Sequence, residues 1–126
     1  MYLLDTNALI NMLCAPQKLT EEVRAILQTE EILFVSVVSL WEIAIKQFIK
    51  KLNINSSIEE IEKICLDKNV SILQISSSEL EKTKTLPDVH RDPFDRLIIS
   101  QAILNNYTVI TSDANFDKYP VDVLFY

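Results

Sequence analysis

Short apolar runs that alternate with amphipathic segments are the feature of this sequence that most limits its fold. The runs at residues 2–4, 32–35 and 107–110 are continuous rather than alternating, which is typical of strands buried on both faces of a parallel sheet. The segments between them carry apolar residues at helical spacing. Because strands that alternate with helices form βαβ units, the sequence predicts a three-layer α/β/α sandwich around a central parallel sheet of about four to five strands.

The expected elements follow this alternation through the whole chain. After the first strand, Ala8, Leu9, Met12 and Leu13 form the apolar stripe of a helix. Further helices are expected at residues 18–30, 40–51 and 78–85 and after Ser57 and Asp92, and further strands at residues 70–75 and 123–126. A chain of 126 residues suits one domain, which we expect to span residues 1–126.

Composition excludes several classes of protein. A net charge of −6 argues against a protein that coats nucleic acid by bulk electrostatics. The chain has no glycine, so it lacks the Gly-rich loops that cradle phosphate in nucleotide-binding proteins. It has no apolar run of the ~20 residues that span a bilayer, and its start does not resemble a signal peptide. Cys14 and Cys65 have no metal-site spacing and are expected to be small core residues. We therefore expect a cytoplasmic protein with no membrane association.

Four carboxylates stand where predicted elements meet. Asp5 and Asp113 follow strand ends, and Glu42 and Asp95 are expected in the first turn of helices that begin near the same edge of the sheet. In open parallel sheets, ligands bind at this carboxyl edge. Several carboxylates in one crevice repel each other unless they are protonated or bridged by a cation. Oxygen ligands without a His or Cys cluster favour Mg²⁺ or Mn²⁺.

Each acid also has a purely structural interpretation. Asp5 could cap the helix that follows it, Ser39 and Glu42 match a capping box, and Asp92 could cap a helix that has Asp95 in its first turn. A cap contributes about 1 kcal/mol, which is reason enough for one acid at one helix. Capping does not explain why all four acids are expected at one edge of the sheet.

Four motifs occur in an order that resembles a known family. They are Tyr-Leu-Leu-Asp-Thr-Asn at residues 2–7, Ser-Leu-Trp-Glu-Ile at 39–43, the block beginning His-Arg-Asp-Pro-Phe-Asp-Arg at 90–99, and Thr-Ser-Asp at 111–113. Over nearly its whole length the chain resembles the PIN-domain family, specifically the VapC-like toxins of bacterial type II toxin–antitoxin pairs. A strand followed by Asp-Thr is common in proteins, whereas the block at residues 90–99 is typical of one branch of this family.

The resemblance implies a PIN-like fold and a metal-dependent endoribonuclease that uses Mg²⁺ or Mn²⁺. The family's acidic residues map onto the four carboxylates named above, as metal ligands and catalytic groups. The resemblance also implies an RNA substrate, a cognate antitoxin that blocks the site, and a homodimer. The sequence departs from close relatives at Asn7, where His is frequent, and at Ser100, where a small apolar residue is usual. Both departures bear on substrate tuning, since neither removes a carboxylate.

Polar residues beside the acids are expected to support them. Thr6, Asn7, Thr111 and Ser112 could hydrogen-bond the carboxylates and orient them toward an ion. Asp92 has two interpretations, a helix cap before the proline or an accessory ligand.

The basic and aromatic residues near the acids are open to alternatives. Arg91, Arg96 and Lys46 could contact RNA, or they could only balance neighbouring charges and a helix end. His90 is the sole histidine and could be a general acid or a solvated loop residue. Trp41 is expected in the core rather than as a platform for base stacking.

Two other functions compete with a ribonuclease. A phosphatase or phosphotransferase of the aspartyl-nucleophile type expects a second acid two residues after the strand-end Asp, where this chain has Asn7. A catalytically silent module that binds RNA or protein would be expected to have lost carboxylates, and all four are present. The sequence therefore favours the metal-dependent endoribonuclease.

Overall fold

A computed structural model describes residues 1–29 and 31–126. In this part of the chain a five-stranded sheet has the strand order β3-β2-β1-β4-β5, with every neighbouring pair parallel. The strands are β1 (Tyr2–Leu4), β2 (Leu33–Ser36), β3 (Val70–Leu73), β4 (Thr108–Thr111) and β5 (Val123–Phe125). The predicted α/β fold with a central parallel sheet is confirmed.

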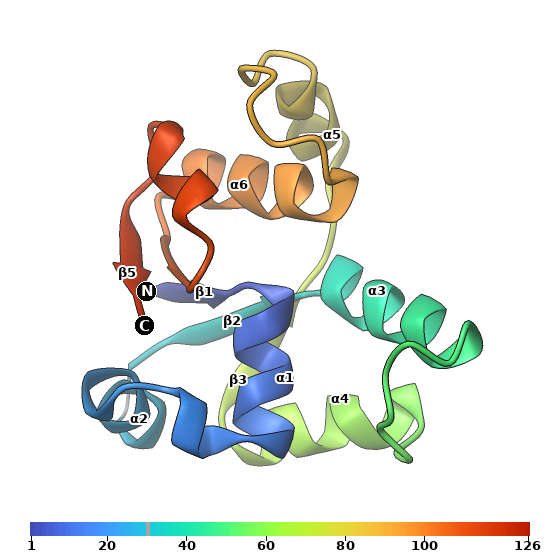
Figure 1. Cartoon of the computed structure of the whole chain (residues 1–126). Coiled ribbons are helices and arrows are strands. Elements are labelled where there is room, and N and C mark those ends of the chain that lie inside the picture. The colour runs from blue at the N-terminus through green and yellow to red at the C-terminus, as the bar shows by residue number, and fades with distance from the viewer. Residues whose placement is uncertain (30) are drawn as a thin grey trace.

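Helices cover both faces of the sheet. In Figure 1, α6 and α5 lie on one side, and α1, α2 and α4 lie on the other. The α-helices are α1 (Thr6–Cys14), α2 (Glu21–Gln28), α3 (Val37–Phe48), α4 (Ile58–Asp67), α5 (Ser77–Thr83) and α6 (Pro93–Asn105), and the 3₁₀ helices are η1 (Pro16–Lys18) and η2 (Ala114–Lys118). No helix within residues 1–29 and 31–126 is long and apolar enough to cross a membrane.

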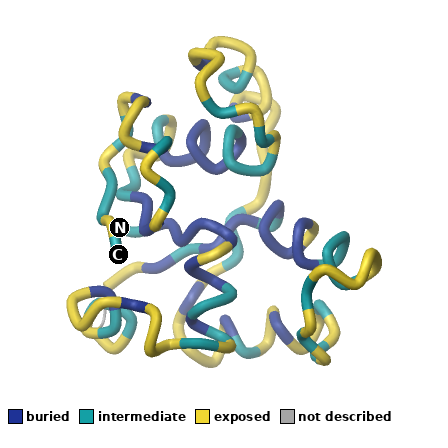
Figure 2. Tube along the Cα trace, in the orientation of Figure 1, coloured by how far each residue is buried: buried dark blue, intermediate teal, exposed yellow. Residues whose placement is uncertain are grey.

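The core consists of two apolar clusters, one on each face of the sheet. Because side chains alternate along a strand, Leu4 joins the cluster packed under α1, α2 and α4, and Leu3 joins the cluster packed under α6. Figure 2 shows the strands and the helical turns beside them as the buried part of the molecule. Cys65 belongs to the core as predicted, whereas Cys14 is exposed at the end of α1, so the prediction for Cys14 is wrong.

Helix α3 begins earlier than the sequence predicted. Strand β2 runs into it without a loop, and Ser36 is its N-cap, accepting a hydrogen bond from the Val38 amide at 3.2 Å. The predicted capping box of Ser39 and Glu42 is therefore wrong, because both residues lie within the helix. Glu42 consequently lies deeper in α3 than the first turn, and its carboxylate is free for another role.

The segment predicted as one helix at residues 18–30 is shorter in the structure. Thr20 caps α2, as its position before two glutamates predicted, and η1 precedes it. Residue 30, the end of the predicted helix, lies outside the described residues. The other elements agree with the predicted ranges to within a few residues at each end.

Left-handed turns are made without glycine. Lys50, Asn69 and Asn106 have φ values of 58°, 61° and 58°, a region that non-glycine residues other than Asn and Asp seldom adopt. Asn106 ends α6, and its amide donates to carbonyls of the last turn. This turn leads the chain directly into β4, whose end carries part of the candidate site.

Candidate functional site

Asp5 lies where β1 ends and is almost fully buried, with 3% of its surface exposed. It is the N-cap of α1, since its Oδ1 atom accepts a hydrogen bond from the Ala8 amide at 2.8 Å. Its Oδ2 atom accepts from the Thr111 hydroxyl at 2.5 Å. Thr111 in turn accepts from the Asp113 amide at 3.0 Å. The ends of the adjacent strands β1 and β4 are thereby joined, and Thr111 supports a carboxylate as predicted.

Asp95 and Asp113 meet at the ring of His90. The Nε2 atom of His90 lies 2.9 Å from Asp95 Oδ2 and 2.9 Å from Asp113 Oδ2. Asp113 is also the N-cap of η2, with its Oδ1 atom accepting from the Asn115 amide at 2.9 Å. Ligand atoms of the three side chains lie within 4.8 Å of one another. A pair of acids from α6 and from the end of β4 is thus linked through one imidazole.

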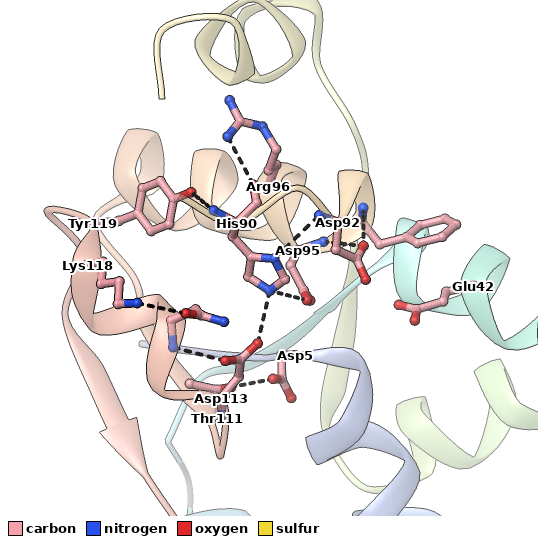
Figure 3. A network of polar contacts seen from close by, with 12 residues as sticks. Asp5, Glu42, His90, Asp92, Asp95, Arg96, Thr111, Asp113, Lys118 and Tyr119 are labelled. Carbon is pink, nitrogen blue, oxygen red and sulfur yellow. Dashed lines mark hydrogen bonds and ion pairs between the residues drawn. The ribbon is translucent and has the colours of Figure 1, made fainter. Parts of the chain in front are cut away.

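Glu42 reaches the same region from α3. Figure 3 shows its carboxylate directed from the side toward the group that Asp5, Asp95 and Asp113 form around His90. The side chain is 8% exposed, and its Oε2 atom pairs with Lys46 Nζ at 2.8 Å. Its Oε1 atom is buried and has no hydrogen-bond partner among the described residues. An unpartnered buried carboxylate oxygen is costly, so this atom indicates a ligand or water that the protein alone does not supply.

The charges of the site are poorly compensated. Burial raises the pKa of Asp5 to about 6, and repulsion from Asp113 and Glu42 adds to this against the hydrogen bonds from Thr111 and Ala8. Burial likewise raises the pKa of Asp95 to about 7, with further repulsion from Asp92, Asp5 and Glu42, while His90 acts in the opposite direction. A cation would favour the ionised form of each acid. The donor set therefore fits a small divalent ion such as Mg²⁺ or Mn²⁺.

A sequence model of the PIN domain matches residues 2–122. The chain belongs to the PIN-domain family. None of the curated proteins compared with it matches.

Solved structures with a similar fold include a toxin–antitoxin complex. VapBC2 from Rickettsia felis, bound to a DNA fragment from the promoter, has a TM-score of 0.75 and 19% identity, covering 98% of this chain and 97% of that chain. FitAcB from Neisseria gonorrhoeae has a TM-score of 0.68 and 21% identity, covering 98% of this chain and 96% of that chain. A toxin–antitoxin complex from Klebsiella pneumoniae has a TM-score of 0.66 and 20% identity, covering 98% of this chain and 96% of that chain. At these identities the likeness shows a shared PIN fold.

Asp92 is a helix cap in this PIN domain. Its Oδ1 atom accepts hydrogen bonds from the amides of Phe94 at 2.8 Å and Asp95 at 3.3 Å. This confirms the capping interpretation and fixes the start of α6, which carries Asp95. Its negative charge also contributes to the raised pKa of Asp95.

Three residues expected to support the carboxylates lie elsewhere. Thr6 is buried and donates its hydroxyl hydrogen to Ser39 at 2.9 Å, linking α1 to α3. Asn7 and Ser112 are exposed, and none of the hydrogen bonds of the described residues joins either of them to the four acids. Thr6 therefore supports the site through helix packing rather than through a carboxylate.

Arg96 anchors the loop that precedes α6. Its Nη1 atom donates to the carbonyls of Pro87 at 2.9 Å and His90 at 3.2 Å. Its Nη2 atom donates to the carbonyls of Thr83 at 2.7 Å and Leu86 at 3.2 Å. The guanidinium is directed at protein carbonyls, so the predicted RNA contact is a loop anchor in this structure.

Lys46 and Arg91, the other two basic residues near the site, differ in how firmly an ion pair holds them. Lys46 lies in the last turn of α3, which agrees with the interpretation that it complements a helix end, and it also pairs with Glu42. Arg91 is exposed, with its Nη2 atom 3.5 Å from Asp88 Oδ2. Because both partners of that pair are exposed, it holds Arg91 only weakly.

The structure corrects the predicted surroundings of two residues near the site. Trp41 is 61% exposed rather than buried, because α3 turns this position away from both core clusters, and its ring meets Phe94 edge-on at 5.4 Å. His90 is not a solvated loop residue, since its side chain is only 15% exposed. The signal that could have indicated His90 was its place at the head of the block at residues 90–96.

Proposed function

We propose that this PIN-domain protein is a metal-dependent endoribonuclease and acts as the toxin of a toxin–antitoxin pair. The observation that carries the proposal is the convergence of acids from four parts of the fold. Asp5 follows β1, Asp113 follows β4, and Asp95 belongs to α6, with Glu42 directed toward them from α3. The raised pKa values of Asp5 and Asp95 and the unpartnered oxygen of Glu42 support a cation among them.

Asp5, Asp95, Asp113 and Glu42 would hold the ion, Mg²⁺ or Mn²⁺. When bound, such an ion polarises a phosphate group and lowers the pKa of water, which are the two requirements of phosphodiester hydrolysis near neutral pH. Hydrogen bonds from Ala8 and Thr111 fix both oxygens of Asp5 before any ligand arrives. This preorganisation lets the carboxylate meet a cation without first reorienting.

Glu42 has a second task besides helping to hold the ion. Because its Oε1 atom lacks a partner among the described residues, it is free to accept a hydrogen bond from the attacking water and orient it toward the phosphorus. The pair with Lys46 fixes the other oxygen of the carboxylate. Asp92 serves this reaction indirectly, by capping the helix that carries Asp95.

RNA and an antitoxin are the proposed partners. The Klebsiella structure with this fold is a toxin–antitoxin complex, and by analogy a cognate antitoxin would cover the acids of this chain. Arg91 lines an open groove of about 370 Å³ together with Trp41, Phe94 and Arg96. It is the basic residue of this groove best placed to meet RNA, because it is exposed whereas Arg96 is held by backbone carbonyls. A homodimer acting in the cytoplasm completes the proposal.

Cleavage of RNA by the purified protein tests the nuclease. We expect cleavage of a mixed cellular RNA with Mg²⁺ or Mn²⁺, none with EDTA, and none by Asp5→Asn. Asp88→Asn, which changes an exposed acid on the loop at the same end of the molecule, is the matched control and should cut normally. Cleavage that persists in EDTA would contradict the metal-dependent mechanism.

Growth of cells that express the chain tests the toxin role separately. Expression alone should arrest growth, expression of Asp5→Asn should not, and co-expression of the product of the neighbouring gene should relieve the arrest. A nuclease that is active in vitro but leaves growth unchanged would contradict the toxin role alone.

A further inference from the structure

His90 occupies a central position that the four-acid mechanism does not use. Its Nε2 atom lies 2.9 Å from an oxygen of Asp95 and 2.9 Å from an oxygen of Asp113, although Asp113 follows it by 23 residues. Among the side-chain contacts of the described residues, this ring is what joins Asp95 on α6 to Asp113 at the end of β4. Figure 3 shows the imidazole between the two carboxylates.

The proton of the ring can be assigned from its other nitrogen. His90 Nδ1 accepts a hydrogen bond of 3.4 Å from the Asp92 amide, and a backbone N–H can only donate. Nδ1 therefore carries the lone pair and Nε2 carries the hydrogen, because the contact at one nitrogen sets the tautomer. The single hydrogen on Nε2 is shared between the hydrogen bond to Asp113 and the Asp95 oxygen 2.9 Å away, and this nitrogen has no lone pair to offer an ion.

The loop that carries His90 is fixed at several points. Tyr119 accepts a hydrogen bond from the His90 amide at 2.8 Å and donates its own hydrogen to the Pro87 carbonyl at 3.0 Å. Arg96 holds the carbonyls of His90 and Pro87 from the other side. The ring itself meets Phe116 edge-on at 6.1 Å. A solvated loop histidine would need none of these restraints.

We propose that His90 is a positioning residue of the metal centre. Its Nε2–H donates to Asp113 and lies 2.9 Å from the Asp95 oxygen, and it holds the two carboxylates at the spacing needed to bind the ion without ligating it. This inference rests on the proposed function, because it concerns the same ion. Without the donor, the two carboxylates would repel each other and separate. Hydrogen-bond partners of ligating side chains are typically worth 10–100-fold in metal affinity or activity.

Binding of Mn²⁺ alone, measured by the electron paramagnetic resonance of the free ion, tests the proposal without RNA. His90→Leu keeps the bulk against Phe116 but removes the donor, and we expect its Mn²⁺ affinity to fall about 10–100-fold. His90→Gln restores an N–H donor near the position of Nε2 and should recover most of the affinity. Asp117→Asn, an exposed acid of η2, is the control and should bind as the wild type does.

Two results would overturn the proposal. One is an unchanged Mn²⁺ affinity in His90→Leu, with thermal unfolding in EDTA showing that the variant is folded. The other is a strong ¹⁴N coupling of the bound Mn²⁺ in pulsed spectra of the wild type, which would make His90 a ligand and needs no variant. Absence of a strong ¹⁴N coupling supports the positioning role of His90.

Failure of the proposed function gives a different pattern. If the wild type binds no Mn²⁺, both proposals fail together. If it binds Mn²⁺ and loses affinity in His90→Leu but cuts no RNA, only the nuclease proposal fails and the positioning role of His90 is supported.

Discussion

The Thr111 hydroxyl donates a hydrogen bond of 2.5 Å to Asp5 Oδ2, joining residues 106 positions apart. With the bond from the Ala8 amide to the other oxygen, the carboxylate has one donor at each atom. Asp5 is therefore both a helix cap and a firmly oriented acid of the site. The two interpretations that the sequence left open are compatible.

Asp5→Asn should fold normally and lose RNA cleavage. Asn is as good an N-cap as Asp and removes a buried charge, so the free energy of unfolding in EDTA at pH 8 should be no lower than that of the wild type. The lost charge should lower the cleavage rate by about 100-fold or more, the scale on which a single electrostatic contact to the reacting group acts. Denaturant unfolding and cleavage of labelled RNA measure the two effects. A variant that cuts at the wild-type rate would remove Asp5 from the centre.

Glu42→Gln should separate stability from metal binding. Glu42 repels Asp5 and Asp95, so the neutral variant should be at least as stable as the wild type when EDTA is present. The same variant should bind Mn²⁺ about 10-fold or more weakly, because a ligand or water-orienting oxygen is lost. Calorimetric titration and thermal unfolding provide the readouts, with Glu62→Gln on the exposed face of α4 as the control. Loss of both stability and affinity would instead indicate a structural role for Glu42.

The stability of the ion-free protein should fall as pH rises through the site's pKa values. Asp5 and Asp95 have folded-state pKa values of about 6 and about 7, against an ordinary value of 3.8. Between these limits the folded state binds more protons than the unfolded state, so protonation stabilises the fold at low pH and this contribution is lost as pH rises through the folded pKa. Denaturant unfolding in EDTA should give a lower stability at pH 8 than at pH 5.

Two comparisons identify the acids responsible for that pH dependence. Asp95→Asn should lose less stability between pH 5 and pH 8 than the wild type does. Mn²⁺ should raise wild-type stability more at pH 8 than at pH 5, since an ion that competes with protons binds the ionised acids better. An equal slope in the wild type and in Asp95→Asn would contradict the assignment of Asp95.

Arg96 and Arg91 should give opposite phenotypes. Arg96→Lys should destabilise the fold by about 2 kcal/mol or more, because one ammonium cannot reproduce the fork that reaches four carbonyls. Arg91→Ala should change stability by less than about 0.5 kcal/mol, as expected for an exposed pair, but should weaken RNA binding and reduce its salt dependence. Filter binding over a series of salt concentrations measures the second effect. Normal RNA affinity in Arg91→Ala would remove this residue from the RNA surface.

The architecture could be predicted from the sequence because its signals are local. The apolar run of residues 2–4 and the alternation with helical stripes were enough for a parallel sheet. Asp5 and Asp113 could then be placed together, since parallel strands end at one edge. The start of α3 could not be predicted from the sequence, because Ser36 and Ser39 are both good caps by residue type. The direct run of β2 into the helix decided between them.

The sequence by itself determined the α/β class and the edge of the sheet where acids gather. Only the tertiary structure decided what His90 and Arg96 do. Both lie in or beside a loop, where periodicity carries no information, and their partners are carbonyls and carboxylates from other elements. Arg96 reaches back to Thr83, and His90 forward to Asp113. Such contacts form only when the packing of α5, α6 and β4 has brought distant parts of the chain together, so residue type alone could not reveal them.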